Sequence, residues 1–342
     1  MVGGLRVTKK RITLDRVVDD ALLDALKVGQ PLRPVIEFRN ARQQVMDVQF
    51  RRPSGRRSRA SLYAGLTRIL DVEALVLKGK DPDFRFFIEH ETHKKAAPDW
   101  KTWAKWGSLD RMEELWPQVK SYLRNREQWL EGDKKAAHHV IEGRLHAAMC
   151  SDTVTSYRVI NREASPSFAD TKTKGEICSQ IRNEIRRVLG GVVEPKAWLK
   201  YHEFGTSPDI LAVDSIGRLI VAEAKPPGYA SGIVKGPIQV RFYAGLIARW
   251  MEQDEDSADA LSRMLAQRIA VGLDQGSTAT FLPHVPVVPV LALGPGEIAP
   301  KRLQHALELR DHLTDLDTTE AGVTSAIEIW QLRADGNVDE QL

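Results

Sequence analysis

The 342-residue chain contains only two cysteines, Cys150 and Cys178, and no Cys-x-x-Cys pair. This scarcity argues against a disulfide framework and against a structural zinc site, and it is typical of a reducing compartment. The longest apolar run, near residues 285–293, is interrupted by prolines and is too short to span a bilayer. The first residues also lack the apolar stretch of a signal peptide. We therefore expect a cytoplasmic protein without a membrane partner.

The sequence also lacks a Gly-x-x-x-x-Gly-Lys-Ser/Thr loop, so it carries no ATP motor of its own. Its 42% hydrophobic and 28% charged residues are globular values, and its length suggests two domains. The net charge of +3 is unevenly distributed: residues 1–150 hold 29 Lys and Arg against 20 Asp and Glu, whereas residues 151–342 hold 20 against 26. This asymmetry predicts a basic module that attracts nucleic acid and an acidic module with another task.

Residues 208–225 are the most informative segment of the chain. Two apolar runs flank a tight turn at 214–217, with Asp209 heading the first run and Glu223 and Lys225 closing the second. Because side chains alternate along a strand, Glu223 and Lys225 share one face, and Ala224 lies on the other. Both faces are otherwise apolar, which is typical of a strand covered on both sides. Charged groups at the end of such a strand need a partner, and a metal ion held by the carboxylates would be one.

Two flanking segments are predicted to be helices. Residues 176–189 have an apolar stripe formed by isoleucines and Val188, and Glu184 falls inside that stripe. Glu184 is therefore a second candidate acidic group, and Glu176 is a weaker one. A helix is also expected to begin at Gln239 and to run to about residue 251, with Gln239 and Tyr243 one turn apart on the same face.

Taken in order, Glu184, Pro208-Asp209, Glu223-Ala224-Lys225 and Gln239-x-x-x-Tyr243 resemble the PD-(D/E)xK nuclease superfamily. The Gln-x-x-x-Tyr helix is similar to that of RecB-like nucleases, and Glu-Ala-Lys-Pro-Pro resembles the nuclease domain of type I restriction subunits. The resemblance covers roughly residues 176–243. It implies metal-assisted phosphodiester hydrolysis with Mg²⁺, for which Mn²⁺ could substitute.

The same resemblance implies a role for each motif residue. Asp209, Glu223 and the carbonyl of Ala224 would bind the metal, and Glu184 would bind it directly or through water. Lys225 would orient the attacking water and stabilise the transition state, and a neighbouring cation could lower the pKa of its ammonium. Gln239 would orient the phosphate or the water, and Tyr243 would support the nucleic-acid backbone.

Several interpretations of the motif remain open. Glu-x-Lys at a strand end also arises by chance as a surface ion pair. The expected function is a magnesium-dependent DNA endonuclease, in restriction or mobile-element defence. The alternatives are a RecB-like exonuclease that needs DNA ends and a non-catalytic DNA-binding or assembly protein that keeps the fold as a scaffold. A homodimer, and a separate ATPase or specificity partner, are possible companions.

The expected fold is α/β: a restriction-endonuclease-like mixed sheet flanked by helices at 170–335, preceded by a separate α+β domain at 1–155. The boundary is expected in the polar segment 151–173. After the motif, helices are expected at 257–271 and 300–313, and strands at 287–293 and 326–332.

Three features of the N-terminal half could bind ligands. The segment 51–59 reads as an exposed loop whose arginines either are simply solvated or contact phosphate: Arg51, Arg52, Arg56, Arg57 and Arg59. Trp100, Trp103 and Trp106, spaced by three, favour core packing over base stacking. Strand alternation at 89–93 would place His90 and His93 on opposite faces, which argues against a metal site there.

Overall fold

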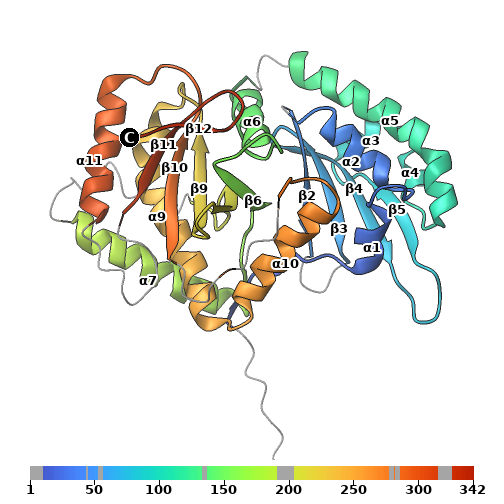
Figure 1. Ribbon diagram of the computed structural model, residues 1–342, viewed down its shortest axis with the longest axis horizontal. Helices are drawn as coiled ribbons and strands as arrows, with labels where there is room; N and C mark the ends of the chain where they lie inside the picture. The colour runs from blue at the N-terminus through green and yellow to red at the C-terminus, as the bar shows by residue number, and fades with distance from the viewer. Residues whose placement is uncertain are drawn as a thin grey trace, which may run out of the picture.

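The structure is a computed structural model, and it describes residues 11–43, 45–52, 57–132, 137–190, 204–276, 281, 286–314 and 326–342. The described residues form two bodies, each built around its own sheet (Figure 1). The α/β class expected from the sequence is confirmed at this level.

A six-stranded mixed sheet forms the centre of the C-terminal body. Its strands are, in spatial order, β12 (Val338–Gln341), β11 (Glu328–Leu332), β10 (Val287–Leu293), β9 (Leu219–Lys225), β8 (Ile210–Asp214) and β6 (Tyr157–Arg162). Strands β9, β10 and β11 run parallel, and the other neighbours are antiparallel. The parallel centre is consistent with the continuous apolar composition of β9 and β10, because such strands are covered on both faces.

Helices cover one face of this sheet. They are α7 (Thr171–Leu189), α9 (Ala230–Gln253), α10 (Ser257–Ala270) and α11 (Pro300–Thr314). This side of the core contains Leu219 and Val221, as the alternation along β9 predicts. The opposite face, with Ile220, Ala222 and Ala224, packs against Leu145 and its neighbours in α6 (Ala137–Met149).

The N-terminal body has an antiparallel sheet in the order β2 (Met46–Arg51), β3 (Arg59–Ala64), β4 (Thr67–Leu75) and β5 (Asp83–Phe87). Its apolar face packs against residues from the helices of this body: α1 (Asp20–Ala25), α2 (Arg33–Asn40), α3 (Glu91–Ala96), α4 (Trp100–Trp103) and α5 (Leu109–Gly132). Strand alternation explains this face, which includes Val48, Leu62 and Val72.

Each body contributes a segment to the core of the other. β1 (Ile12–Thr13) pairs with β7 (Ser167–Phe168), and Ile12 is buried in the C-terminal core. Conversely, Val271 and Leu273, which follow α10, are buried in the N-terminal core. The simple division into 1–155 and 170–335 therefore needs correction, because each core takes residues from the other end of the chain.

Buried charges join the bodies where α10 meets β2. Asp47 lies 3.6 Å from the guanidinium groups of both Arg39 and Arg268, and all three side chains are buried. Arg39 also donates to the carbonyl of Cys150, and Arg268 donates to the carbonyl of Val48 at 3.1 Å. Burying these charges is tolerable only while the set stays together, so the contact helps to hold one arrangement of the bodies.

Some expected boundaries differ from the structure. The helix expected to begin at Gln239 begins at Ala230, with Pro237 inside it. The segment 89–93 is not a strand: α3 begins at Glu91, and His90 caps it by accepting a hydrogen bond from Thr92 N at 3.2 Å. Among the described residues, no helix has both the length and the apolar character needed to cross a membrane.

Candidate functional site

A tight hairpin brings Asp209 beside Glu223. The carboxylate of Asp214 accepts hydrogen bonds from the backbone of Ile216 (3.1 Å) and Arg218 (2.8 Å), and Gly217 has a φ of +86°. Asp and Gly are suited to such a turn because they supply a local acceptor and a left-handed conformation. The hairpin pairs Ile210 with Ala222, so Asp209, one residue earlier, lies opposite the end of β9. Its Oδ2 accepts the backbone N–H of Ala224 at 2.9 Å.

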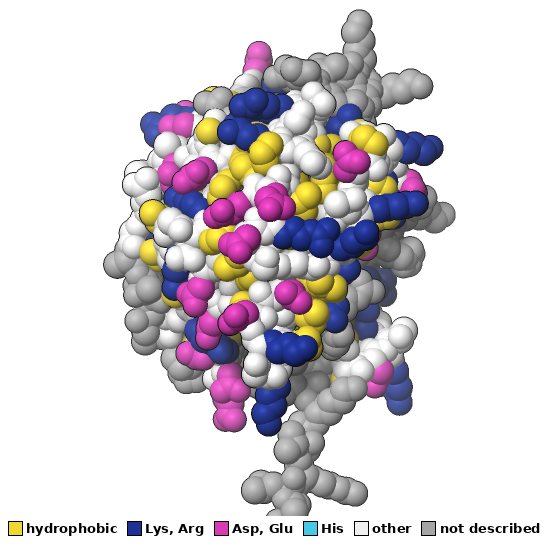
Figure 2. Space-filling view, turned by 90° about the vertical axis from the view of Figure 1, so that its right-hand side faces the viewer, with side chains coloured by type: hydrophobic (Ala, Val, Ile, Leu, Met, Phe, Trp, Pro, Cys, Tyr) yellow, Lys and Arg dark blue, Asp and Glu magenta, His cyan; other side chains and the backbone are white. Residues whose placement is uncertain are grey.

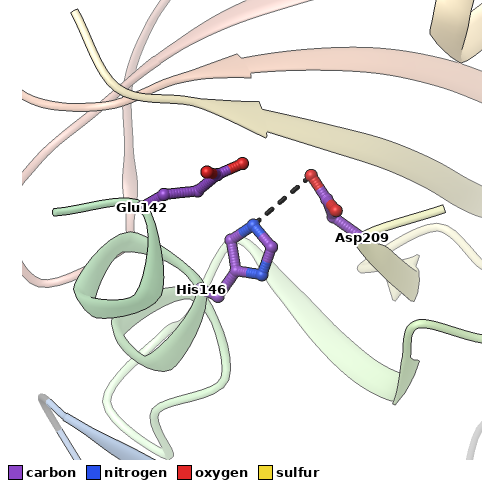
Figure 3. Close-up of side chains that lie close together, drawn as sticks. All are labelled: Glu142, His146 and Asp209. Carbon is purple, nitrogen blue, oxygen red and sulfur yellow. Dashed lines mark ion pairs between the residues drawn. The ribbon is translucent and has the colours of Figure 1, made fainter. Parts of the chain in front are cut away.

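Helix α6 adds two side chains to Asp209. Glu142 and His146 lie one turn apart on α6 and both point toward Asp209 (Figure 3). His146 Nε2 is 3.3 Å from Asp209 Oδ2, and one ligand atom from each of the three residues lies within 4.8 Å of the others. Two carboxylates and an imidazole at this spacing could hold a divalent cation.

Glu223 and Lys225 form the adjoining part of the cluster. Both are buried, and the ammonium of Lys225 donates to Glu223 Oε1. Gln239 Nε2 donates to the same oxygen at 2.6 Å and to the Tyr243 hydroxyl at 3.1 Å. The other carboxylate oxygen of Glu223 is buried and has no hydrogen-bond partner among the described residues. A buried carboxylate oxygen without a partner is costly, and a bound cation would remove that cost.

Burial and neighbouring charges shift the pKa values of Asp209 and Glu223 in opposite directions. Burial opposes ionisation of Asp209, but His146, Lys225 and the Ala224 N–H outweigh it and lower the pKa of Asp209. Burial and the charge of Asp209 raise the pKa of Glu223 well above its ordinary value. Burial alone would lower the pKa of Lys225, but Glu223, Asp209 and Glu142 raise it instead. In the protein without metal Lys225 is therefore an ammonium, and a lowering of its pKa by a bound cation stays a prediction.

Close packing places α9 over the ends of the strands. A Cβ added to Gly236 would lie 2.4 Å from Leu291 of β10, so only glycine allows this approach. Gln239, nearly one turn further along the helix, can therefore reach Glu223.

Glu184 is not brought to this cluster, and the expectation that it would bind the metal needs correction. Its carboxylate pairs with Arg249 at 2.9 Å. Arg249 follows Gln239 by ten residues on α9, which places it about 15 Å further along the helix. The apolar stripe of α7 is real, but Glu184 lies at its edge and is half-buried beside α9.

Tyr243 lies directly beside Gln239. Its ring is buried, and its hydroxyl contacts Gln239, so it supports Gln239, and a contact with a nucleic-acid backbone stays a prediction. Gln239 itself is engaged with Glu223, which makes it a positioning group for that carboxylate. Ala224 lies between Glu223 and Lys225 as expected, and binding of a metal by its carbonyl stays a prediction.

Arg51 ends β2 and Arg59 begins β3, and the described arginines of this segment differ in their surroundings. Arg51 contacts Glu163 at 2.8 Å, and Arg59 is buried against Asp71 at 3.3 Å. These two do not lie on an exposed loop, and the interpretation as phosphate contacts is corrected for both. Arg52 is 47% exposed, and Arg57 is exposed with its guanidinium 5.0 Å from the Trp106 ring centroid. Arg56 lies outside the described residues.

The tryptophans of this body are mainly structural. Trp103 is buried and stacks edge-on with Tyr122, while Trp100 packs at the border of the core. Figure 2 shows the side of the molecule that is on the right in Figure 1, where Lys and Arg are interspersed with Asp and Glu. This face does not form one continuous basic surface, so Arg52 and Arg57 have to be tested individually.

Glu142 and His146 were missed by the sequence analysis. The available signal was their spacing, since residues four apart on a helix share a face. This spacing was not linked to the motif, because α6 precedes the expected domain boundary. Only the tertiary structure places α6 against β9. Comparisons with protein-family models, with curated proteins and with solved structures gave no match to this chain.

Proposed function

We propose that this protein is a metal-dependent deoxyribonuclease that hydrolyses phosphodiester bonds. The observation that carries the proposal is the convergence of Asp209, Glu223 and Lys225 at one end of β8 and β9, beside Glu142 and His146. The mixed sheet with helices α7 and α9 is compatible with the restriction-endonuclease-like fold that the motif implies.

The side chains present suit a divalent metal ion. Asp209 and Glu223 would hold it, and Glu142 and His146 would complete its protein ligands. The oxygen-rich set suits Mg²⁺, and the imidazole makes Mn²⁺ an equally suitable ion. A bound ion would lower the pKa of a coordinated water and neutralise charge on the phosphate.

The chain's own residues have separate tasks in this proposal. Asp209 stays ionised, because its pKa is lowered, and so provides a permanent anionic ligand. Lys225, an ammonium in the protein without metal, would place a positive charge where charge develops on the phosphate. Gln239 fixes the orientation of Glu223, and Tyr243 fixes Gln239.

Covalently closed plasmid and the same plasmid linearised provide the test, each with Mg²⁺, with Mn²⁺ or with EDTA. We expect the circle to be nicked or linearised, and we expect EDTA and Lys225→Ala each to abolish this. Glu184→Gln is the matched control and should leave cleavage intact. Loss of the linear DNA alone would identify an exonuclease. Cleavage that survives Lys225→Ala would contradict the assigned site.

The wider setting is also part of the proposal. A nuclease without a motor that cuts both strands would act as two copies or with a partner that supplies specificity or translocation. Defence against foreign DNA is the role that best fits such an enzyme.

A further inference from the structure

An exposed aromatic ring lies beside the cluster of Asp209, Glu223 and Lys225 but does not belong to it. Tyr229 follows Lys225-Pro-Pro-Gly at the start of α9, and 44% of its surface is exposed. The ammonium of Lys225 lies 5.7 Å from the centroid of the Tyr229 ring. A phosphate that contacts Lys225 would therefore bring its adjoining nucleotide close to this ring.

The position of the ring is built into the helix. A Cβ added to Gly232 would lie 2.3 Å from the Tyr229 ring and 3.0 Å from the Lys225 side chain. Glycine at this position lets the ring lie against the first turn of α9, next to the stem of the lysine. Tyrosine is enriched at binding surfaces, and a ring held in place loses little entropy when it binds a partner.

We propose that Tyr229 stacks on an unpaired nucleobase next to the phosphate held by Lys225. This inference rests on the proposed nuclease function and narrows its substrate to DNA whose bases are unpaired at the cutting position. In a paired duplex, base faces are covered by their neighbours, whereas single strands expose them to aromatic side chains. The exposed ring thus favours single-stranded DNA over intact duplex.

The contact can be isolated by combining changes on both molecules. Binding of a fluorescently labelled single strand would be measured by anisotropy, with Ca²⁺ present and the strand verified as intact. An abasic site would be moved along the strand one nucleotide at a time. At one position we expect it to weaken binding about 5- to 140-fold, the equivalent of about 1 to 3 kcal/mol of stacking.

Tyr229→Ala should weaken binding of the intact strand by a similar factor, and the abasic site should then have no further effect. Tyr229→Phe and Tyr229→Trp should bind like the wild type. Tyr229→Leu, which still covers Gly232 but has no aromatic face, should bind like Tyr229→Ala. If Tyr229 had only a structural role, the abasic site would weaken binding by the same factor in Tyr229→Leu and in Tyr229→Phe.

Three results would overturn the inference. In the first, Tyr229→Ala and the abasic site weaken binding independently, so that their two factors multiply when they are combined. In the second, Tyr229→Ala binds with wild-type affinity, and in the third, the protein binds duplex and single strand equally. In each of these the protein still binds DNA, so the proposed function survives. If the wild type binds no DNA of either form, the proposed function and this inference fail together.

Discussion

His146 Nε2 lies 3.3 Å from Asp209 Oδ2, although the two residues belong to different parts of the chain. His146 comes from α6, before the expected domain boundary, and Asp209 precedes β8. The candidate site therefore depends on how α6 docks against the sheet and is not contained in the motif segment alone.

Metal binding should depend on His146 and Asp209. For a ligand at 100 times its dissociation constant, linkage adds about 2.7 kcal/mol to the free energy of unfolding. We expect Mn²⁺ to raise the melting temperature of the wild type, and we expect His146→Ala and Asp209→Asn to remove most of this rise. Calorimetry with and without Mn²⁺ would check it. Glu184→Gln is the control, and a loss of the rise in that variant would return Glu184 to the site.

Acid should destabilise the protein through His93. Burial, together with the charges of Arg126 and His90, lowers the pKa of His93 from 6.5 to about 4. Because the folded protein keeps this imidazole neutral, its contribution to stability is complete above pH 6.5 and is lost as the pH falls toward 4. The loss amounts to at most about 3 kcal/mol. Urea unfolding at several pH values should show a shallower decline in His93→Gln than in the wild type. Equal declines in the two proteins would refute the assignment.

Two exposed arginines should contribute to DNA affinity through charge. Each phosphate contact adds about 1 to the slope of log K against log salt. Arg52→Gln with Arg57→Gln should therefore reduce the slope by about 2 while the melting temperature stays nearly constant. Fluorescence titrations at several salt concentrations measure this slope. Arg59→Met is the contrasting variant: it should destabilise the fold by about 1 to 3 kcal/mol, because the buried Asp71 loses one of its two arginine partners and keeps only Arg68, at 3.6 Å. An unchanged slope in the double variant would remove these arginines from the interface.

The approach of α9 to β10 should tolerate no side chain at Gly236. Its Cβ would lie 2.4 Å from Leu291, so Gly236→Ala should push the helix outward and cost about 1 to 3 kcal/mol. Because Gln239 would move with the helix, DNA cleavage should fall even under conditions in which the variant remains folded. Gly175→Ala in α7 is the matched control: nothing lies within 4 Å of its added Cβ, and alanine should stabilise that helix by about 0.5 to 1 kcal/mol. Denaturant unfolding of both variants provides the comparison. A stable, active Gly236→Ala would show that the contact is not needed.

Local pattern was a good guide where short-range physics decides the structure. The alternation along 219–225 assigned Leu219 and Val221 to one face of the sheet and Ile220 and Ala222 to the other, and both assignments are confirmed. The turn at 214–217 followed from Asp214 and Gly217, whose preferences act within a few residues.

Pattern misplaced residues whose role depends on a distant partner. Glu184 lies beside the apolar stripe of α7, yet Arg249 on the neighbouring helix pairs with it. Arg51 and Arg59 read as exposed charge, yet Glu163 and Asp71 pair with them. Neither the helical period nor the number of charges along the sequence indicates which distant residue will form the ion pair.

The sequence alone determined the strand pair, the helices on either side, and the placement of Glu223 and Lys225 on one face, because backbone periodicity and turn chemistry are local. The tertiary structure alone decided that Glu142 and His146 join Asp209, that Gln239 reaches Glu223, and that Tyr229 lies beside Lys225. These contacts arise when helices α6 and α9 pack against the sheet, and packing depends on the shape and burial of the whole core.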